Sequence, residues 1–107
     1  MIEMEISRNL HDRNLSLRQI AHQFDISPRQ IQRIMACHGT IFSDFVREKR
    51  LARAMSRLGD VAYAYKSIEE ISEGCGFSDI STFYRAFKTM FQCRPGDVRR
   101  NAGQHSP

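Results

Sequence analysis

Two short stretches of the chain carry polar side chains that suit hydrogen bonding to the edges of nucleic-acid bases. In "SPRQIQRIM", Arg29, Gln32 and Arg33 are spaced so that they share one side of a helix. In "SDISTFYRAFK", Ser81 and Arg85 share one side in the same way. Arg donates two hydrogen bonds to guanine O6 and N7, and Gln pairs with the N6/N7 edge of adenine. Both stretches therefore favour the reading of base pairs in a major groove.

These outward residues have individual expected roles. We expect Arg33 and Arg85 to read guanine and Gln32 to read adenine. Arg29 can reach a base or a phosphate. Ser81 is short and polar, and suits a contact to a base or to the backbone.

Tyr84 is the aromatic residue on the outward side of the second stretch, and two interpretations of it stay open. Its ring can pack on a thymine methyl group or donate to a phosphate. It can equally be a half-buried ring that covers the neighbouring phenylalanines. Ile80 and Thr82 fall at the border of this side.

The charge balance agrees with a polyanionic partner. The chain of 107 residues has sixteen Lys and Arg against twelve Asp and Glu, a net charge of +4. Only Lys49, Lys66 and Lys88 are lysines, and Arg presents a planar fork of donors that suits phosphates and guanine. We therefore expect double-stranded DNA as the partner, while a helical protein-interaction module with a basic face is the alternative.

Enzyme chemistry has little support in this sequence. The acidic residues Glu69, Glu70 and Glu73 lie near a helix start without a partner nucleophile. The three cysteines form no CxxC pair, and no histidine lies at metal-ligand spacing from them. We expect no enzyme activity, no catalytic residue, no bound metal and no cofactor. Because no apolar run approaches a membrane span, we expect no membrane partner and a place in the cytoplasm, associated with the nucleoid.

The elements that position the first stretch are indicated by helix caps. Ser16 caps one helix, and Ser27 caps the next, with Pro28 in its first position and Gln30 completing a capping box. Gly39 ends this second helix. Its predicted core side consists of Ile31, Ile34 and Met35.

A longer helix is predicted in the middle of the chain, capped by Ser43 and ended by Gly59. Its periodicity gathers four arginines on the side away from the apolar residues: Arg47, Arg50, Arg53 and Arg57. The first pattern then returns. Ser67 and Ser78 cap two further helices, and the last of them is predicted to bury Phe83, Phe87 and Met90.

This return is an internal repeat with a fixed register. The interval from Ser16 to Ser67 equals the interval from Ser27 to Ser78. Inside the last helix it is one residue longer, where Ile31 corresponds to Phe83. Each half therefore predicts two helices joined by a tight turn, which is a helix-turn-helix unit used twice. The residues predicted to contact DNA phosphates around these units are Arg47, Arg50, Lys88, Arg94, Arg99 and Arg100.

The second half, "IEEISEGCGFSDISTFYRAFKTMFQCRPGDVRR", resembles the DNA-binding domain of the AraC/XylS family of bacterial transcription regulators. The resemblance extends over roughly Leu15 to Arg100, although Gln92 stands where the family pattern has Gly. The residues that match the pattern are Ile68, Ile71, Gly76, Phe77, Phe83, Arg85, Phe87, Lys88, Phe91, Pro95 and Arg99.

The resemblance implies an all-α fold of about seven helices, with two helix-turn-helix subdomains joined by a long linker helix. It implies transcription regulation through adjacent major-groove segments, and it adds Ile80 to the candidate base readers. The expected divisions are an N-terminal subdomain (1–42), the linker helix (43–59), a C-terminal subdomain (60–100) and a tail (101–107). Family members usually carry an effector-binding domain, which we expect to be absent from this chain. RNA polymerase is a further expected partner.

Overall fold

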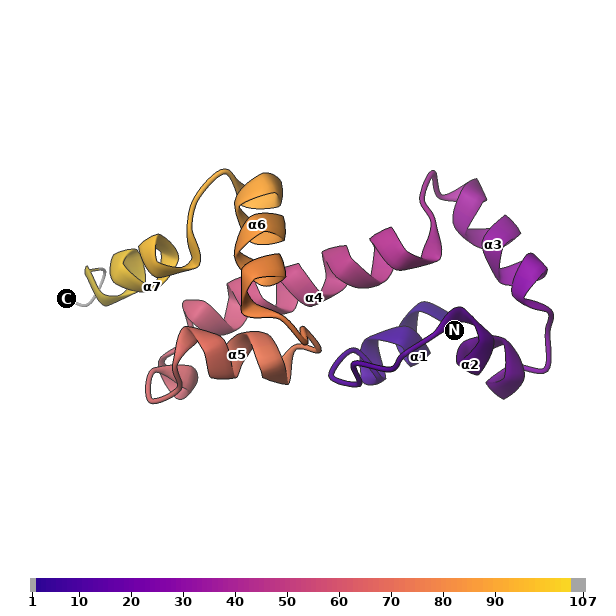
Figure 1. Ribbon diagram of the computed structural model, residues 1–107, viewed down its shortest axis with the longest axis horizontal. Coiled ribbons are helices and arrows are strands. Elements are labelled where there is room, and N and C mark those ends of the chain that lie inside the picture. The colour runs from indigo at the N-terminus through magenta and orange to yellow at the C-terminus, as the bar shows by residue number, and fades with distance from the viewer. Residues whose placement is uncertain (1, 105–107) are drawn as a thin grey trace.

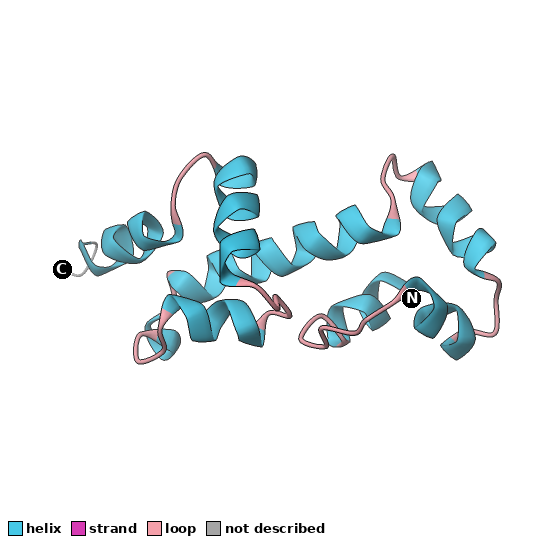
Figure 2. Cartoon of the chain, viewed as in Figure 1, coloured by secondary structure: helices cyan, strands magenta, loops and turns pink. Residues whose placement is uncertain are grey.

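The computed structural model describes residues 2–104, which form helices and contain no strand (Figure 1, Figure 2). The expected all-α fold with seven α-helices is confirmed for this range. The elements in chain order are α1 (Ile2–Arg8), α2 (Leu17–Gln23), α3 (Pro28–Cys37), α4 (Phe42–Leu58), the 3₁₀ turn η1 (Val61–Tyr63), α5 (Ile68–Gly74), α6 (Ile80–Phe91) and α7 (Pro95–Gln104).

Helix α4 crosses the molecule, with α1 to α3 at one end and α5 to α7 at the other (Figure 1). The molecule is elongated, with principal extents of 50 × 26 × 23 Å. Helix α7 continues to Gln104, into the segment expected to be a tail, while 105–107 lie outside the described residues. Between residues 2 and 104 no helix is both long and apolar enough to cross a membrane.

Three of the predicted serine caps are confirmed. The Ser16 hydroxyl accepts from the Gln19 backbone N–H. Ser27 with Gln30, and Ser67 with Glu70, each form a reciprocal capping box. These caps satisfy backbone donors at the helix starts and therefore fix where α2, α3 and α5 begin.

Two helix starts differ from the sequence prediction. Helix α4 begins after Ile41, which provides no side-chain cap, so Ser43 lies inside the first turn. Helix α6 is capped by Asp79 and not by Ser78, because the Asp79 carboxylate accepts from the Ser81 N–H and the Thr82 hydroxyl. These hydrogen bonds lower the pKa of Asp79.

The core is divided into two separate clusters. The N-terminal cluster contains Ile6, Leu10, Ile20, Ala21, Ile31, Met35 and Val46. The C-terminal cluster contains Leu51, Ala54, Leu58, Ile71, Cys75, Phe77, Phe83 and Phe87. Helix α4 contributes to both, since Val46 belongs to the first and Leu51 to the second. The clusters define an N-terminal and a C-terminal subdomain whose buried cores are both completed by this helix.

Aromatic rings fill the C-terminal cluster and hold α6 in place. The Phe83 ring centroid lies 5.0 Å from that of Phe77 and 5.6 Å from that of Phe87. Phe83 and Phe87 are fully buried, as predicted. Such tilted and edge-on pairs stabilise a core beyond the area that they bury.

Two residues predicted as core are partly exposed. Ile34 is 40% exposed because α3 buries only the narrow side defined by Ile31 and Met35. Met90 is 43% exposed because it lines a groove between α4 and α6 and is not enclosed by them.

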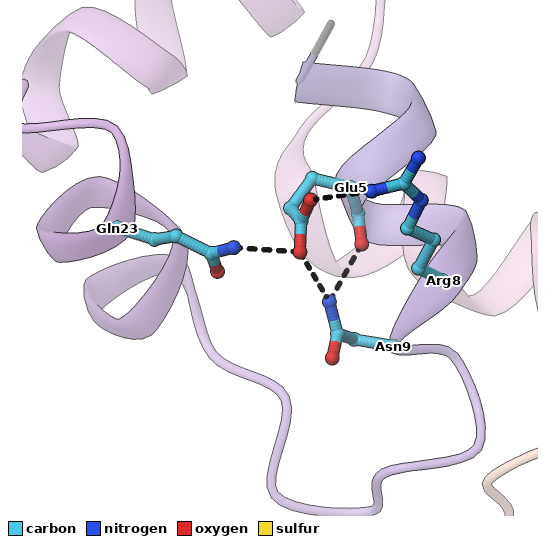
Figure 3. A network of polar contacts seen from close by, with 4 residues as sticks. All are labelled: Glu5, Arg8, Asn9 and Gln23. Atoms are coloured by element: carbon cyan, nitrogen blue, oxygen red, sulfur yellow. Dashed lines mark hydrogen bonds and ion pairs between the residues drawn. The ribbon is translucent and has the colours of Figure 1, made fainter.

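A polar network joins α1 to α2 at the surface (Figure 3). The Glu5 carboxylate accepts from the Gln23 amide at 2.6 Å and from the Asn9 amide at 3.0 Å, and Arg8 lies 3.7 Å from its other oxygen. The first two hydrogen bonds are the main reason that the pKa of Glu5 is lowered.

Candidate nucleic-acid interface

Helix α3 presents a polar side to solvent. Arg29, Gln32 and Arg33 are exposed, and they lie across the helix from the buried Ile31 and Met35. The capping box at Ser27 fixes the start of the helix, and the buried pair fixes its rotation. The three polar side chains are therefore held outward together, as predicted.

Helix α6 presents the corresponding side in the C-terminal subdomain. Ser81, Arg85 and Lys88 are exposed there, opposite Phe83 and Phe87. Arg33 and Arg85 thus occupy equivalent outward positions in the two subdomains.

Tyr84 and Ile80 lie at the edge of the α6 side. Tyr84 is 41% exposed, and its ring centroid lies 5.9 Å from that of Phe83. Part of this ring therefore covers the core, while the rest stays accessible. Ile80 is half-buried and packs against the C-terminal cluster.

Three hollows lie along the N-terminal half of α4, and each shares lining residues with the next. The first is lined by Gln32, Ala36 and residues around Ser43. The second also includes Ser43 and is lined by Arg13, Arg47 and Thr82. The third shares Arg47 and Thr82, has a volume of about 430 Å³, and is lined by Arg85 and Thr89. We call this surface the inter-reader groove.

Arg47 lies at the centre of the inter-reader groove. Its side chain is 49% exposed and forms an ion pair with Asp44 at 2.8 Å. An exposed pair of this kind adds little stability, so the guanidinium can exchange its partner at low cost. Arg13 and Thr89 also line the groove, and no sequence motif predicted either of them as a site residue. Neither residue is part of a capping motif, and neither lies at a position that carries the same polar residue type in both halves of the repeat.

The four arginines of α4 do not form one solvent-exposed side. Only Arg47 is exposed, while Arg50, Arg53 and Arg57 are half-buried. Arg53 donates to the Ser7 carbonyl at 2.7 Å, and Arg57 lies 4.9 Å from the Tyr63 ring centroid. The side of α4 that was predicted to lie away from its apolar residues is therefore only partly open to solvent, because α1, the α1–α2 loop and η1 lie beside it.

The predicted phosphate contacts differ in how many free donors they have. Arg50 donates to the Leu10 carbonyl at 2.9 Å and to the Asp12 carbonyl at 2.7 Å. Arg99 donates to the carbonyls of Tyr63 and Lys66. Their phosphate roles stay predictions, but these guanidinium groups already have intramolecular partners.

The remaining predicted phosphate contacts are more open. Lys88, Arg94 and Arg100 are exposed, and Arg100 forms only a long surface pair with Asp97 at 3.6 Å. Among the described residues, no three His, Cys, Asp or Glu side chains converge as a metal site would require.

Comparison with known proteins places the chain among transcription regulators. The model of a helix-turn-helix domain family matches residues 7–101. The transcriptional activator RhrA of Rhizobium meliloti is 37% identical over 101 residues, which cover 94% of this chain and 32% of that protein. The chain therefore spans about a third of the length of this relative.

Solved structures show the same fold. An AraC-type transcriptional regulator from Chromobacterium violaceum is 29% identical, with a TM-score of 0.85, and the alignment covers 98% of this chain and 91% of that one. The C-terminal domain of AraT, a response regulator from Geobacillus stearothermophilus, is 25% identical with a TM-score of 0.81. That alignment covers 94% of this chain and 81% of the AraT chain.

Proposed function

The chain belongs to the AraC/XylS-type helix-turn-helix family, and we propose on that premise that it regulates transcription by sequence-specific binding of double-stranded DNA. Helices α3 and α6 are the two readers in this proposal, and they enter adjacent major-groove segments on one side of the duplex.

One observation carries this proposal beyond family membership. The two subdomains present equivalent polar sides with an outward arginine in the same place, Arg33 on α3 and Arg85 on α6. The inter-reader groove joins these sides and has Arg47 at its centre. Along one side, a duplex presents a major-groove segment, then backbone phosphates, then a second major-groove segment. These would face the α3 side, the groove around Arg47 and the α6 side in the same order.

The base-reading roles follow from side-chain chemistry. Arg33 and Arg85 would each donate two hydrogen bonds to guanine, and Gln32 would pair with adenine. Arg29 and Ser81 would contact a base or the adjoining backbone. Ile80 and the exposed part of Tyr84 would supply apolar contacts, of which a thymine methyl group is the natural partner.

Phosphate contacts would supply most of the sequence-independent affinity. The residues with accessible charge are Arg47, Lys88, Arg94 and Arg100. Arg50 and Arg99 come second, because each must release backbone carbonyls before it can bind a phosphate.

The activity of the whole protein is a wider proposal, because this chain matches only part of its relatives. RhrA is named an activator, and activation through contact with RNA polymerase at the nucleoid is the role that we propose here. The proposed mechanism contains no catalytic step.

Selection of bound duplexes from a random library tests the proposal. We expect a consensus with two conserved blocks whose centres are about 10 base pairs apart. Mobility shifts with that consensus should weaken steeply with salt, with a log–log slope near −4 if about four to five phosphates are neutralised. The double variant Arg33→Ala, Arg85→Ala should keep its fold and lose the preference for the consensus. Failure to retain any duplex at low salt would favour the alternative, a helical protein-interaction module.

A further inference from the structure

Two arginines of α4 reach across to backbone carbonyls at the end of α1 and in the loop after it. Arg50 Nε donates to the Leu10 carbonyl at 2.9 Å, and its terminal nitrogen donates to the Asp12 carbonyl at 2.7 Å. Arg53 donates to the Ser7 carbonyl at 2.7 Å. We call Arg50, Arg53 and these three carbonyls the arginine clasp.

The clasp joins the two subdomains and is not internal to either of them. Arg50 and Arg53 flank Leu51, which is buried in the C-terminal cluster. The carbonyls that they hold belong to the N-terminal subdomain, where Leu10 is buried in the other cluster. Because the clusters share no buried residue, the clasp supplies polar connections between two cores that are also joined by α4.

Gly76 adds a third element to this junction. It lies in the turn between α5 and α6 with a positive φ of 99°. A Cβ atom at this position would lie 2.0 Å from the Leu10 carbonyl oxygen and 2.6 Å from Arg50 Nε. The turn that leads into α6 therefore lies against both the Leu10 carbonyl and the Arg50 guanidinium that donates to it.

The chemistry of the clasp favours a fixed orientation. A guanidinium is planar and directs several donors at set angles, so Arg50 holds two carbonyls at once and limits rotation about α4. A lysine presents a single ammonium on a flexible stem and cannot reproduce this pairing. Arg50 is also half-buried, which reduces screening by salt.

We propose that the arginine clasp sets the distance and rotation between α3 and α6, and thereby the half-site spacing that the protein accepts. This inference rests on the proposed function. Two linked readers bind strongly only when the linkage presents both at once, and a loose linkage accepts several spacings with lower affinity. Arg50 and Arg53 are positioning residues in this mechanism: Arg50 keeps its carbonyl partners when DNA binds, and the phosphate contacts are left to the arginines and the lysine with accessible charge.

Arg57 provides a matched control. It is a half-buried arginine on the same helix, but its contacts stay inside the C-terminal subdomain: it lies over the Tyr63 ring and donates to Cys75 Sγ. Arg57→Gln removes the same charge as Arg50→Gln without touching the clasp. Arg50→Lys keeps the positive charge but removes the planar guanidinium with its paired donors. Comparing it with Arg50→Gln separates the effect of the hydrogen-bond geometry from the effect of the charge.

The first measurement is made without DNA. Spin labels are placed on the exposed Cys37 at the end of α3 and on a cysteine introduced in α5 by Glu69→Cys. Cys93 is replaced by Ser so that it is not labelled, and Cys75 is retained because it is buried. Pulsed electron resonance should give a narrow distance distribution for this protein and for Arg57→Gln. It should give a broadened one for Arg50→Lys and for Arg50→Gln. Unchanged widths in the folded clasp variants would overturn the inference, whatever the protein binds.

The second measurement uses the consensus selected by the unaltered protein. Adding two base pairs between the half-sites should weaken its binding roughly 10- to 100-fold, because only one reader then engages. In Arg50→Lys the same insertion should cost no more than about threefold, while binding to the original spacing weakens. Circular dichroism confirms folding. Equal spacing preference in Arg50→Lys, or a selected site with a single half-site, would overturn the inference while leaving DNA binding established.

Discussion

At the residue scale, the surroundings of an arginine decide its role more than its position in a pattern. Arg33 and Arg85 are exposed on helix sides whose opposite sides are buried, and their outward placement could be predicted from periodicity. Arg50 and Arg99 look the same in the sequence, yet both donate to backbone carbonyls from distant elements. Every residue has a carbonyl, so no side-chain pattern marks which carbonyls will accept these bonds.

Replacing Arg85 with Ala tests base reading at the second reader. We expect this variant to lose discrimination at one base pair, a cost of about 1–3 kcal/mol for the cognate site, because a bidentate pair to guanine disappears. Binding constants for the consensus and for its three single-base alternatives at that position measure the effect. The matched core variant Phe87→Ala should instead lower the free energy of unfolding by about 3–5 kcal/mol. If Arg85→Ala melts the protein, its outward role is wrong.

Acidification tests the Glu5 network between α1 and α2. Hydrogen bonds from Gln23 and Asn9 lower the pKa of Glu5 in the folded state. A lowered folded-state pKa means that the stabilisation is complete above the ordinary glutamate value, about 4.3, and is lost as the pH falls through the folded value. The difference between the denaturation midpoints at pH 7 and at pH 3 should therefore be smaller for Glu5→Gln than for the unaltered protein. An identical pH dependence in both proteins would contradict this.

At the element scale, the helix starts show what local sequence can and cannot determine. Ser16, Ser27 and Ser67 stand alone before their helices, and all three caps could be predicted. Ser78 and Asp79 are adjacent, and both are good cap residues. In the structure Asp79 is the cap, and the turn before it packs at Gly76 against the Leu10 carbonyl, a contact between segments far apart in the sequence. Propensity alone does not contain that information.

The end of α6 offers an element-scale prediction. Gln92 caps the helix in the left-handed conformation, with φ of 59°, at the position where the family pattern has Gly. A residue with a Cβ atom is strained there, whereas glycine adopts this conformation freely. We expect Gln92→Gly to raise the free energy of unfolding by about 0.5–1 kcal/mol. Chemical denaturation of Gln92→Gly measures this change, with Gln92→Ala as the control. If Gln92→Gly is less stable than the unaltered protein, the hydrogen bond from the Gln92 side chain to the Thr89 carbonyl contributes more stability than the relief of backbone strain.

At the scale of the whole molecule, two small cores on one helix explain both the elongated shape and the need for a junction. The repeat in the sequence predicted the two helix-turn-helix units, because caps and apolar periodicity are local. Their relative orientation could not be predicted, because it depends on the arginine clasp and on the absence of a side chain at Gly76.

The separation of the readers predicts that bound DNA is bent. Helix α6 packs on α4 near Arg47 and Leu51, so only about half of α4 separates it from the end of α3. From Phe42 to Leu51 the helix advances about 14 Å at 1.5 Å per residue, whereas successive major-groove segments on one side of straight DNA lie about 34 Å apart. Because α3 lies beyond the start of α4, its displacement from the α4 axis accounts for part of the difference between these two lengths.

Bending of the duplex toward the protein supplies the remainder, because it brings the two groove segments closer on the bound side. We expect a phasing assay with the selected consensus to show a bend directed toward the protein. The spacer between the half-sites should also favour flexible pyrimidine–purine steps, although no side chain reads them. Replacing such steps with a stiff A-tract should weaken binding and leave single half-site affinity unchanged. Straight DNA in a complex where both half-sites are protected would contradict the prediction, and would require α3 and α6 to move apart on binding.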